Sequence, residues 1–535
     1  MNECYAVLLD TVSIQNYIFR SNKLKENLGA SYLVDQIFGS YLAEAIGKIT
    51  GRSAEEERQH LFDWENTDAE TLKCADAVEI GYIGGGNALL FFQKESQAKQ
   101  FIEIWTKILL VYAPGLTTAV ALNKFPQDPT KFKSSLNSLF KKLKENKSRY
   151  IPITTLPRHG ITAECARSEL SAEIYNSDIK EYVSADVNAR IEAARFSKEK
   201  IEQKYQALLQ DKYCFVNELD KLGGVQGEDS HIAVVHIDGN DVGKLVKQAD
   251  SLKASRYLSK TIRTATERAF EKIIEITVNK YDEIMDSLGF SDENPPKKEN
   301  DKNVLPIRSI ILGGDDVTFV CDARLGIYFA KIFIKEFEGK TKENGKKLTA
   351  CAGVSIIKTK YPFYRGYWLA EELCANAKAR RKEVDETTSF LDFHVSMGGV
   401  AGSLKYIRER YFGIDPRGND EKGGEYLLYR PLKVVPKEPF DELGLEMMLA
   451  GVWHLKNDFP KNKLADLRAV LTHSRDARLE FVQDLKYRGL EFPKIEGYQF
   501  ENELFENNLT PYFDMLELLR FYPEFALKEI GENHE

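Results

Sequence analysis

The sequence predicts an α+β protein in which one domain occurs twice, each copy forming an antiparallel sheet with helices on one face. The first observation is a repeated strand and turn. Asp10 ends an apolar strand and precedes a glycine-rich turn at Gly84 by 74 residues, while Asp238 does the same and precedes Gly313 by 75 residues. The second observation is that a helix and an alternating strand follow each turn, which gives the order βααββαβ. Matched spacing over so long a stretch indicates two copies of one domain.

Hydrophobic periodicity predicts the same series of elements in both copies. In the first copy these are a strand at 4–10, a helix at 29–49, a hairpin at 77–92, a helix at 96–111 and a strand at 116–122. In the second copy they are a strand at 231–238, helices within 241–285, a hairpin at 308–321, a helix at 323–338 and a strand at 348–357. Residues 287–304 interrupt the second copy and predict a loop.

These elements predict four domains. The first copy occupies 1–125, a mostly helical linking domain 126–230, the second copy 231–400 and a helical C-terminal domain 401–535. A chain of 535 residues is too long for one hydrophobic core, which agrees with this division.

Composition excludes several other classes. With 43% hydrophobic and 29% charged residues, the chain reads as soluble and globular, and its net charge of -8 gives no overall attraction to nucleic acid. It contains neither an apolar run of about 18 residues nor a signal-peptide pattern, so we expect a cytoplasmic protein without membrane contact. The seven cysteines are scattered without a Cys-x-x-Cys pair, which argues against disulfides and zinc and predicts buried thiols.

The chemistry-bearing motif lies in the second copy. Asp238 ends a strand, and Gly313-Gly314-Asp315-Asp316 forms the turn of the neighbouring hairpin, so a paired sheet is expected to bring the three carboxylates to one edge. Bound Mg²⁺ would relieve their repulsion, bridge triphosphate oxygens and lower the pKa of an attacking 3′-hydroxyl. The glycines, together with Gly239, allow a tight turn and the close approach of a nucleotide.

Glycine and aspartate are also typical of an ordinary hairpin turn, so Gly313-Gly314-Asp315-Asp316 could form a turn without any metal site. The upstream strand ending in Asp-Gly, the spacing and the lysine-rich helix downstream favour the metal site. On that helix, Lys378 is placed to hold a triphosphate as a point charge, and Lys244 follows Asp238 on the next helix. For both lysines a solvated helix face remains the alternative.

The motifs together resemble a known family. The order of elements is that of the ferredoxin-like palm of nucleotide polymerases and cyclases. The stretches 238–245, 312–316, 370–378 and 391–394 resemble the polymerase-like large subunit of type III CRISPR effector complexes, or a stand-alone relative. The stretches 10–19 and 29–34 are similar to the family's degenerate first palm. The resemblance covers most of residues 1–400 and implies two ferredoxin-like palm domains in tandem, the first degenerate, plus helical domains.

The resemblance implies a nucleotidyltransferase of antiviral defence that makes a cyclic oligoadenylate second messenger from ATP. Asp238, Asp315 and Asp316 match the family's acidic positions, and the expected Mg²⁺ (or Mn²⁺) site consists of these three residues with Ile237. The expected nucleotide-binding residues are Gly239, Asn240, Lys244, Gly313, Gly314 and Lys378. The family's HD nuclease domain and four-cysteine zinc module are not recognisable, so DNase activity is not expected.

The first copy is expected to be inactive. Gly86 and Asn87 stand where Asp315 and Asp316 stand in the second copy, which leaves only Asp10. Two interpretations of its turn stay open: a tight hairpin, or a site for a second, acceptor nucleotide. The lysine-rich stretch from Lys131 to Lys147 is likewise compatible with a solvated helix or with contact to guide RNA or a partner subunit.

Three alternatives compete with oligoadenylate synthesis. The same site would also suit adenylyl transfer to S-adenosylmethionine, or a GTP-using cyclase that shares the palm. A non-catalytic nucleotide- or RNA-binding subunit of a type III effector complex, working with target RNA, is the remaining class.

Overall fold

The computed structural model describes residues 3–64, 78–84, 86–149, 155, 160–222, 230–396, 402–414, 424–435, 444–495 and 498–532. The chain divides into two compact units. The first unit comprises residues 1–206, 241–267 and 310–317, and the second comprises 207–240, 268–309 and 318–535. The predicted α+β fold with two palm-type sheets is confirmed.

The first unit is built on a four-stranded sheet with the order β2-β3-β1-β4. Its strands are β1 (Glu3–Val12), β2 (Val78–Gly84), β3 (Asn87–Phe92) and β4 (Thr117–Pro126). All pairs are antiparallel, and Asp10 lies opposite Asn87 on one side and Ala119 on the other. Helices α5 (Glu95–Tyr112) and α6 (Phe132–Arg149) pack against this sheet.

The predicted helix at 29–49 is wrong as a single element. Two helices occupy this stretch, α2 (Leu24–Ile37) and α3 (Ser40–Thr50), and the chain leaves helical geometry at Gly39, which precedes α3. The short α1 (Ile14–Ile18) precedes them, and α4 (Ala54–Asp63) follows α3. Later in the chain come the β5–β6 hairpin (Ile174–Asn176 and Glu181–Val183), α7 (Ala185–Lys204), which packs along α2, and α9 (Val242–Gln248).

The second palm sheet has six strands in the order β11-β12-β8-β13-β14-β17. Their bounds are β8 (His231–Gly239), β11 (Ile307–Gly313), β12 (Asp316–Asp322), β13 (Ala350–Lys358), β14 (Phe390–Val395) and β17 (Leu432–Lys433). Strand β13 runs antiparallel to β8, with Cys351 opposite Asp238, and parallel to β14. The predicted hairpin and its two neighbours are therefore present, and β14 and β17 widen the sheet.

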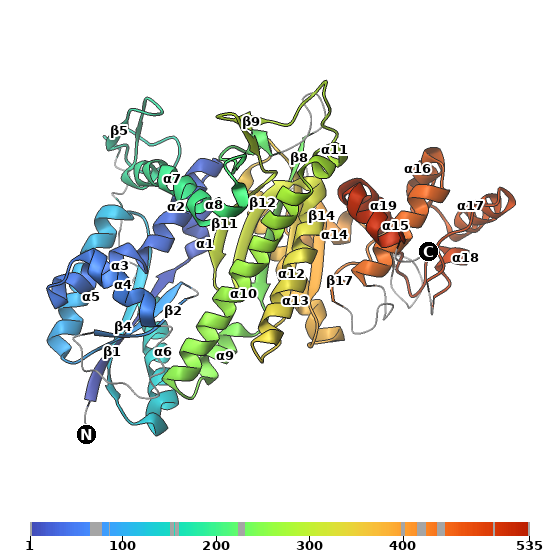
Figure 1. The fold of residues 1–535 in the computed structure, drawn as a ribbon. Helices are drawn as coiled ribbons and strands as arrows, with labels where there is room; N and C mark the ends of the chain where they lie inside the picture. The colour runs from blue at the N-terminus through green and yellow to red at the C-terminus, as the bar shows by residue number, and fades with distance from the viewer. Residues whose placement is uncertain are drawn as a thin grey trace. The chain divides into compact units, whose positions relative to one another are not determined.

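Three helices lie across one face of this sheet (Figure 1): α10 (Leu252–Asn279), α12 (Gly326–Glu343) and α13 (Phe363–Val384). Helix α13 approaches β13 so closely at Gly353 that an added Cβ would stand 2.0 Å from the Ala370 carbonyl oxygen. Only glycine fits this crossing, which fixes the height of α13 above the sheet.

The predicted loop at 287–304 is also wrong in part. It contains the short strands β9 (Lys298–Glu299) and β10 (Lys302–Val304), and β10 pairs with β7 (Tyr213–Cys214). Helix α11 (Tyr281–Ser287) precedes it, and α8 (Gln206–Leu209) joins the two units in sequence.

The remainder of the second unit is mostly helical. It contains α14 (Leu404–Tyr411), the β15–β16 pair (Gly413–Ile414 and Glu425–Tyr426), and helices α15 (Leu445–Asp458), α16 (Lys461–Val470), α17 (Arg475–Tyr487), α18 (Phe500–Glu503), α19 (Tyr512–Phe521) and α20 (Glu524–Glu532). Helix α15 packs against both α19 and α20.

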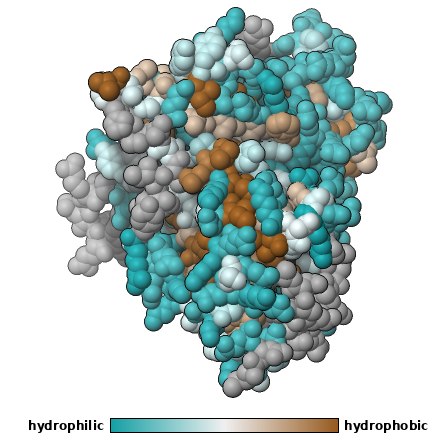
Figure 2. Space-filling view, turned by 90° about the vertical axis from the view of Figure 1, so that its left-hand side faces the viewer, coloured by the Kyte–Doolittle hydropathy of each residue, from teal (hydrophilic) through white to brown (hydrophobic). Residues whose placement is uncertain are grey.

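The character of the surface and the burial of the cysteines agree with what the composition predicts. The face drawn in Figure 2 is mostly hydrophilic, with hydrophobic side chains gathered near its centre. Among the described residues, no helix has the length and apolar character needed to cross a membrane. Six described cysteines are free and buried, as predicted, and Cys74 lies outside the described residues.

Candidate functional site

Asp238 stands at the end of β8 and forms an ion pair with Lys378. The Nζ atom of Lys378 donates to Asp238 Oδ2 and lies 3.3 Å from the Gly239 carbonyl oxygen. Burial lowers the pKa of Lys378, but the nearby Asp238 carboxylate outweighs this effect and holds that pKa above its usual value. The lysine is therefore charged and placed at the aspartate, not on a solvated helix face.

The residues beside Asp238 are held by the neighbouring strand β13 and by Thr349, which directly precedes it. Ile237 is fully buried and pairs with Ala352 of β13. Asn240 is buried, its amide nitrogen donates to the Thr349 carbonyl oxygen at 2.8 Å, and its side chain donates to Thr349 Oγ1 at 2.9 Å. Asn240 thus ties the end of β8 to the start of β13.

The Gly-Gly-Asp-Asp motif forms a hairpin turn, as the sequence predicts. Strand β11 ends at Gly313 and β12 begins at Asp316, which leaves Gly314 and Asp315 in the turn. Gly314 has a φ of 64°, in the left-handed region that favours glycine. A side chain at Gly313 would meet only ordinary contacts, at 3.6 Å or more, so the turn needs just one of the two glycines for steric reasons.

Two side chains of the first unit hold this turn. Thr266 Oγ1 donates to the Gly314 carbonyl oxygen at 2.5 Å. The side-chain amide of Gln15, from the short helix α1, donates to Asp316 Oδ2 at 2.9 Å. The sequence assigns no role to either residue, although Gln15 lies within the matching stretch 10–19, because only the folded chain brings them to the motif.

Lys244 differs from Lys378. Its Nζ forms an ion pair with Asp241 Oδ1 at 2.7 Å within α9 and its cap, and 72% of its side chain is exposed. Such a surface pair contributes little to stability, about 0–1 kcal/mol. The structure thus gives Lys244 a solvated position with a local partner.

The first palm repeats the pairing of strand-end aspartate and lysine. Asn87 Nδ2 donates to Asp10 Oδ1 at 3.2 Å, and Lys147 Nζ of α6 forms an ion pair with Asp10 Oδ2. Lys147 follows the first residue of its helix, Phe132, by 15 residues, as Lys378 follows Phe363. Burial raises the pKa of Asp10, and Lys147 and Asn87 oppose that rise.

This pairing changes the meaning of the lysine-rich stretch at 131–147. Lys147 contacts Asp10, and Lys142 Nζ donates to the Leu122 carbonyl oxygen at 2.7 Å. Two of its cations therefore face their own sheet. Lys147 and Lys378 occupy the same position in their helices, 15 residues after the first helical residue. This match can be found in the sequence only when the two copies are aligned through their strands.

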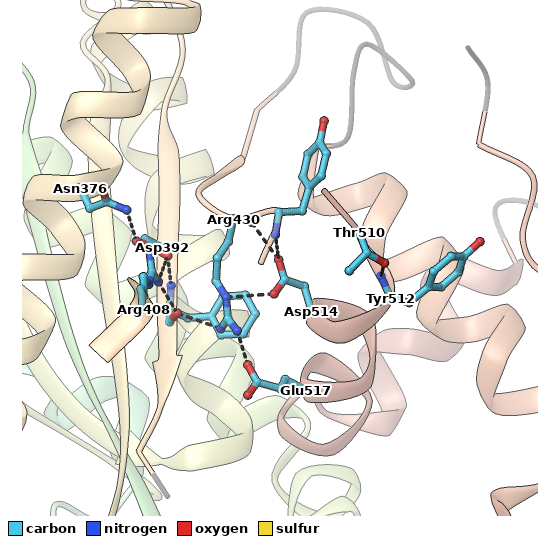
Figure 3. A network of polar contacts seen from close by, with 10 residues as sticks. Asn376, Asp392, Arg408, Arg430, Thr510, Tyr512, Asp514 and Glu517 are labelled. Carbon is cyan, nitrogen blue, oxygen red and sulfur yellow. Dashed lines mark hydrogen bonds and ion pairs between the residues drawn. The ribbon is translucent and has the colours of Figure 1, made fainter. Parts of the chain in front are cut away.

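A buried ionic network at the far side of the second sheet was not predicted, although Asp392 belongs to the matching stretches. Asp392 is fully buried, accepts from both terminal nitrogens of Arg408 at 2.8 and 2.7 Å, and accepts from Asn376 at 2.7 Å (Figure 3). Next to it, the buried Arg430 is paired with Asp514 at 3.0 Å and with Glu517 of α19. The network joins β14, α13 and α14 to the C-terminal helices.

The predicted metal site depends on oxygen donors from three aspartates. Among the described residues, no group of three or more His, Cys, Asp or Glu side chains is arranged so that it could hold a metal ion. The expected meeting of Asp238, Asp315 and Asp316 is therefore not present as a preformed three-carboxylate site. Mg²⁺ rarely uses an all-protein cage and is commonly bound by one or two carboxylates together with substrate phosphates. The carboxylates of Asp238, Asp315 and Asp316 have the hard oxygen donors that this mode needs, and the cation at Asp238 shows that this carboxylate accepts a positive charge.

A family model places the second palm. Residues 231–386 match the model of Cas10/Cmr2, second palm domain. The second palm of this chain is therefore similar to that of Cas10/Cmr2. The matched residues include β8, the Gly-Gly-Asp-Asp turn and Lys378, so the resemblance to the large subunit of type III CRISPR effectors is confirmed.

Solved structures show the same fold over nearly the whole chain. Csm1 of T. onnurineus matches with a TM-score of 0.52 at 14% identity, covering 99% of this chain and 69% of that chain. A Csm1-Csm4 cassette in complex with AMPPNP matches with a TM-score of 0.51 at 14% identity, covering 99% and 69%. A Csm1-Csm4 cassette in complex with pppApA matches with a TM-score of 0.50 at 13% identity, covering 97% of this chain and 69% of that chain. No curated protein matches this chain.

Proposed function

We propose that this protein is a Mg²⁺- or Mn²⁺-dependent nucleotidyltransferase that makes an adenine-nucleotide second messenger, a cyclic oligoadenylate, from ATP in type III CRISPR-type defence. The observation that supports it most is the strand order β11-β12-β8 within the Cas10/Cmr2-type palm. That order sets the Gly-Gly-Asp-Asp hairpin beside the strand that ends at Asp238.

In this proposal, Asp238, Asp315 and Asp316 are the catalytic carboxylates and bind the metal ion, with Ile237 beside Asp238. A metal ion held there would supply charge neutralisation for the triphosphate and would lower the pKa of the attacking 3′-hydroxyl. Gly239, Asn240, Lys244, Gly313 and Gly314 contribute to nucleotide binding. Lys378 is already charged and paired with a carboxylate, and it offers a point charge to phosphate oxygens.

The proposal extends to partners. The two Csm1-Csm4 matches are complexes of a similar fold with a second subunit and with AMPPNP or pppApA. We infer that this chain also works in an effector complex with guide RNA and is controlled by target RNA. The four domains predicted from the sequence would then be a degenerate first palm, a linking domain, a catalytic second palm and a C-terminal domain.

The test is product analysis. The purified chain is incubated with Mg²⁺ and ATP, with and without S-adenosylmethionine, and the products are identified by mass spectrometry. We expect an adenylate oligomer that is absent from the Asp315→Ala/Asp316→Ala variant. Unchanged product from that variant would refute the assigned carboxylates.

The competing functions give different results in the same assay. An adduct that forms only with S-adenosylmethionine would identify adenylyl transfer, and preference for GTP over ATP in competition would identify a GTP-using cyclase. Nucleotide binding without turnover, with guide and target RNA present, would identify a non-catalytic subunit.

A further inference from the structure

A pocket lies at the end of the second sheet that is remote from Asp238. It is a cavity of about 390 Å³ lined by the first half of α13, the end of β14 and α14. Val395 at the end of β14 pairs with Ile356 of β13, and Ile356 pairs with Ala233 of β8. Ala233 precedes Asp238 by five residues, roughly 16 Å at about 3.3 Å per residue. The pocket is thus separate from the strand end that carries the aspartate.

Aromatic side chains line the pocket on two sides. Tyr361 and Trp368 come from the α13 side, and Tyr411 and Phe412 from the end of α14. Trp368 is 37% exposed and Tyr411 is 52% exposed, so both rings are accessible from solvent. Exposed rings that flank a cavity offer stacking surfaces for a planar ligand.

A buried imidazole supplies an unused polar atom. His394 lines the pocket and is only 5% exposed, and its Nδ1 has no hydrogen-bond partner among the described residues. Burial, reinforced by Arg430 and Arg408, lowers the pKa of His394 to about 3. The ring is therefore neutral at physiological pH, with one N–H donor and one acceptor nitrogen. Buried polar atoms are normally paired, so this nitrogen is available to bond a molecule that enters the pocket.

The rim carries a fixed cation. Arg365 is exposed, its Nε donates to the Tyr364 hydroxyl at 3.0 Å, and its guanidinium lies 5.8 Å from the centre of that ring. The acidic residue in the lining, Glu372, accepts from the Leu404 amide at 2.6 Å, at the start of α14. Its carboxylate is therefore committed to the helix end, and Arg365 remains the group suited to an anion.

We propose that this pocket binds a phosphate-bearing nucleobase, whether from a free nucleotide or from a single-stranded oligonucleotide. The base stacks between Trp368 and Tyr411 and hydrogen-bonds to His394, and its phosphate meets Arg365. Stacking rings, a hydrogen-bonding group and a neighbouring arginine are the features by which proteins hold unpaired bases.

The walls of the pocket are preorganised. The Asp392 network fixes β14 to α14 through Arg408 and to α13 through Asn376, and Arg430 donates to the Phe393 carbonyl oxygen at 2.8 Å directly before His394 (Figure 3). A site whose walls are held by buried charge pairs loses less entropy on binding than one built on loops.

The experiment measures binding by calorimetry to the full chain carrying Asp315→Asn and Asp316→Asn, in EDTA, so that turnover is removed. The probes are AMP, GMP, CMP and UMP, the hexanucleotides A6 and U6, and inorganic phosphate. Each probe is also tested on Trp368→Ala, Trp368→Phe and Tyr411→Ala. The matched control is Tyr487→Ala, which removes a ring that is 92% exposed and lies outside the pocket lining.

We expect at least one nucleotide or hexanucleotide to bind, Trp368→Ala and Tyr411→Ala each to weaken it about tenfold or more, and Trp368→Phe to restore most of the affinity. Equal affinity for monomer and hexamer assigns a free nucleotide, and much tighter hexamer binding assigns a strand. The proposal is overturned if no probe binds at millimolar concentration, if phosphate binds as well as nucleotides, or if neither ring variant weakens binding. Should Trp368→Ala be unfolded by circular dichroism, the more exposed Tyr411→Ala decides.

Discussion

The two palms share a polar pair but differ in the turn beside it. In each, a lysine that follows the first helical residue by 15 positions holds the strand-end aspartate: Lys147 with Asp10 and Lys378 with Asp238. The turn has Gly86 and Asn87 in the first palm and two aspartates in the second. Because the lysine–aspartate pair persists where the acids are gone, it belongs to the fold, and the turn carries the difference in chemistry.

The contacts of Gly86 and Asn87 in the first palm disfavour aspartates at these two positions. Gly86 has a φ of 76°, and an added Cβ would stand 2.4 Å from Cδ1 of Ile14. Asn87 now donates to Asp10, where a second carboxylate would repel it. The Asn87 side chain makes a hydrogen bond to Asp10, where an aspartate would place two carboxylates side by side. This palm therefore needs no metal ion to offset such repulsion.

The largest expected difference between the palms is catalytic. Asp238→Asn removes a metal-binding carboxylate in the proposed site and should lower the rate of product formation by about 10³-fold or more, since metal stabilisation of a transition state amounts to several kcal/mol. Asp10→Asn, the matched change in the first palm, should lower it by less than about tenfold. Initial rates with ATP and Mg²⁺ measure both. Equal losses would show that both palms take part in catalysis and would contradict an inactive first palm.

The next largest effect concerns packing of the helix that carries the lysine. Ala121 of β4 lies two residues beyond Ala119, the partner of Asp10, just as Gly353 lies two beyond Cys351, the partner of Asp238. The Cβ of an alanine at 353 would stand 2.0 Å from the Ala370 carbonyl oxygen of α13. Gly353→Ala should therefore lower the free energy of unfolding by about 3 kcal/mol.

Two control variants accompany Gly353→Ala in urea titrations followed by circular dichroism. Ala121→Gly should cost about 1 kcal/mol. Gly339→Ala, in α12 with open space around the added Cβ, should stabilise by up to about 1 kcal/mol. A Gly353→Ala variant as stable as the parent would contradict the close crossing of α13.

A smaller effect is expected at the degenerate turn. Gly86→Ala should cost about 2 kcal/mol, because it combines a left-handed backbone with contact to the end of a flexible isoleucine side chain. Gly51→Ala has nearly the same φ, 77°, with nothing within 4 Å of the new Cβ, and should cost about 1 kcal/mol. Equal costs would mean that backbone conformation alone keeps glycine at 86.

The repeat made much of this architecture predictable. Period-two strands, the matched spacing and the turn composition located both sheets and the Gly-Gly-Asp-Asp hairpin to within a few residues. The break between α2 and α3, the short strands β9 and β10, and the contacts of Gln15 and Thr266 could not be predicted, because tertiary contacts and not local periodicity determine them. Asp392 was recognised by resemblance alone, and its arginine partner lies 16 residues away, on another element.

The smallest expected effect tests the shared pair itself. Burial raises the pKa of Asp10, and Lys147 opposes that rise, so Lys147→Ala should raise the pKa of Asp10 further. A carboxyl with a raised pKa stays protonated to higher pH in the folded state, and removing the adjacent cation strengthens that preference. The carboxyl ¹³C shift of Asp10, assigned by its loss in Asp10→Asn, measures this during a pH titration. Lys99→Ala, which removes an exposed lysine paired with Glu95, is the control and should leave Asp10 unchanged. An unchanged or lower pKa in Lys147→Ala would show that the lysine does not stabilise the carboxylate, and the parallel with Lys378 and Asp238 would then be one of position only.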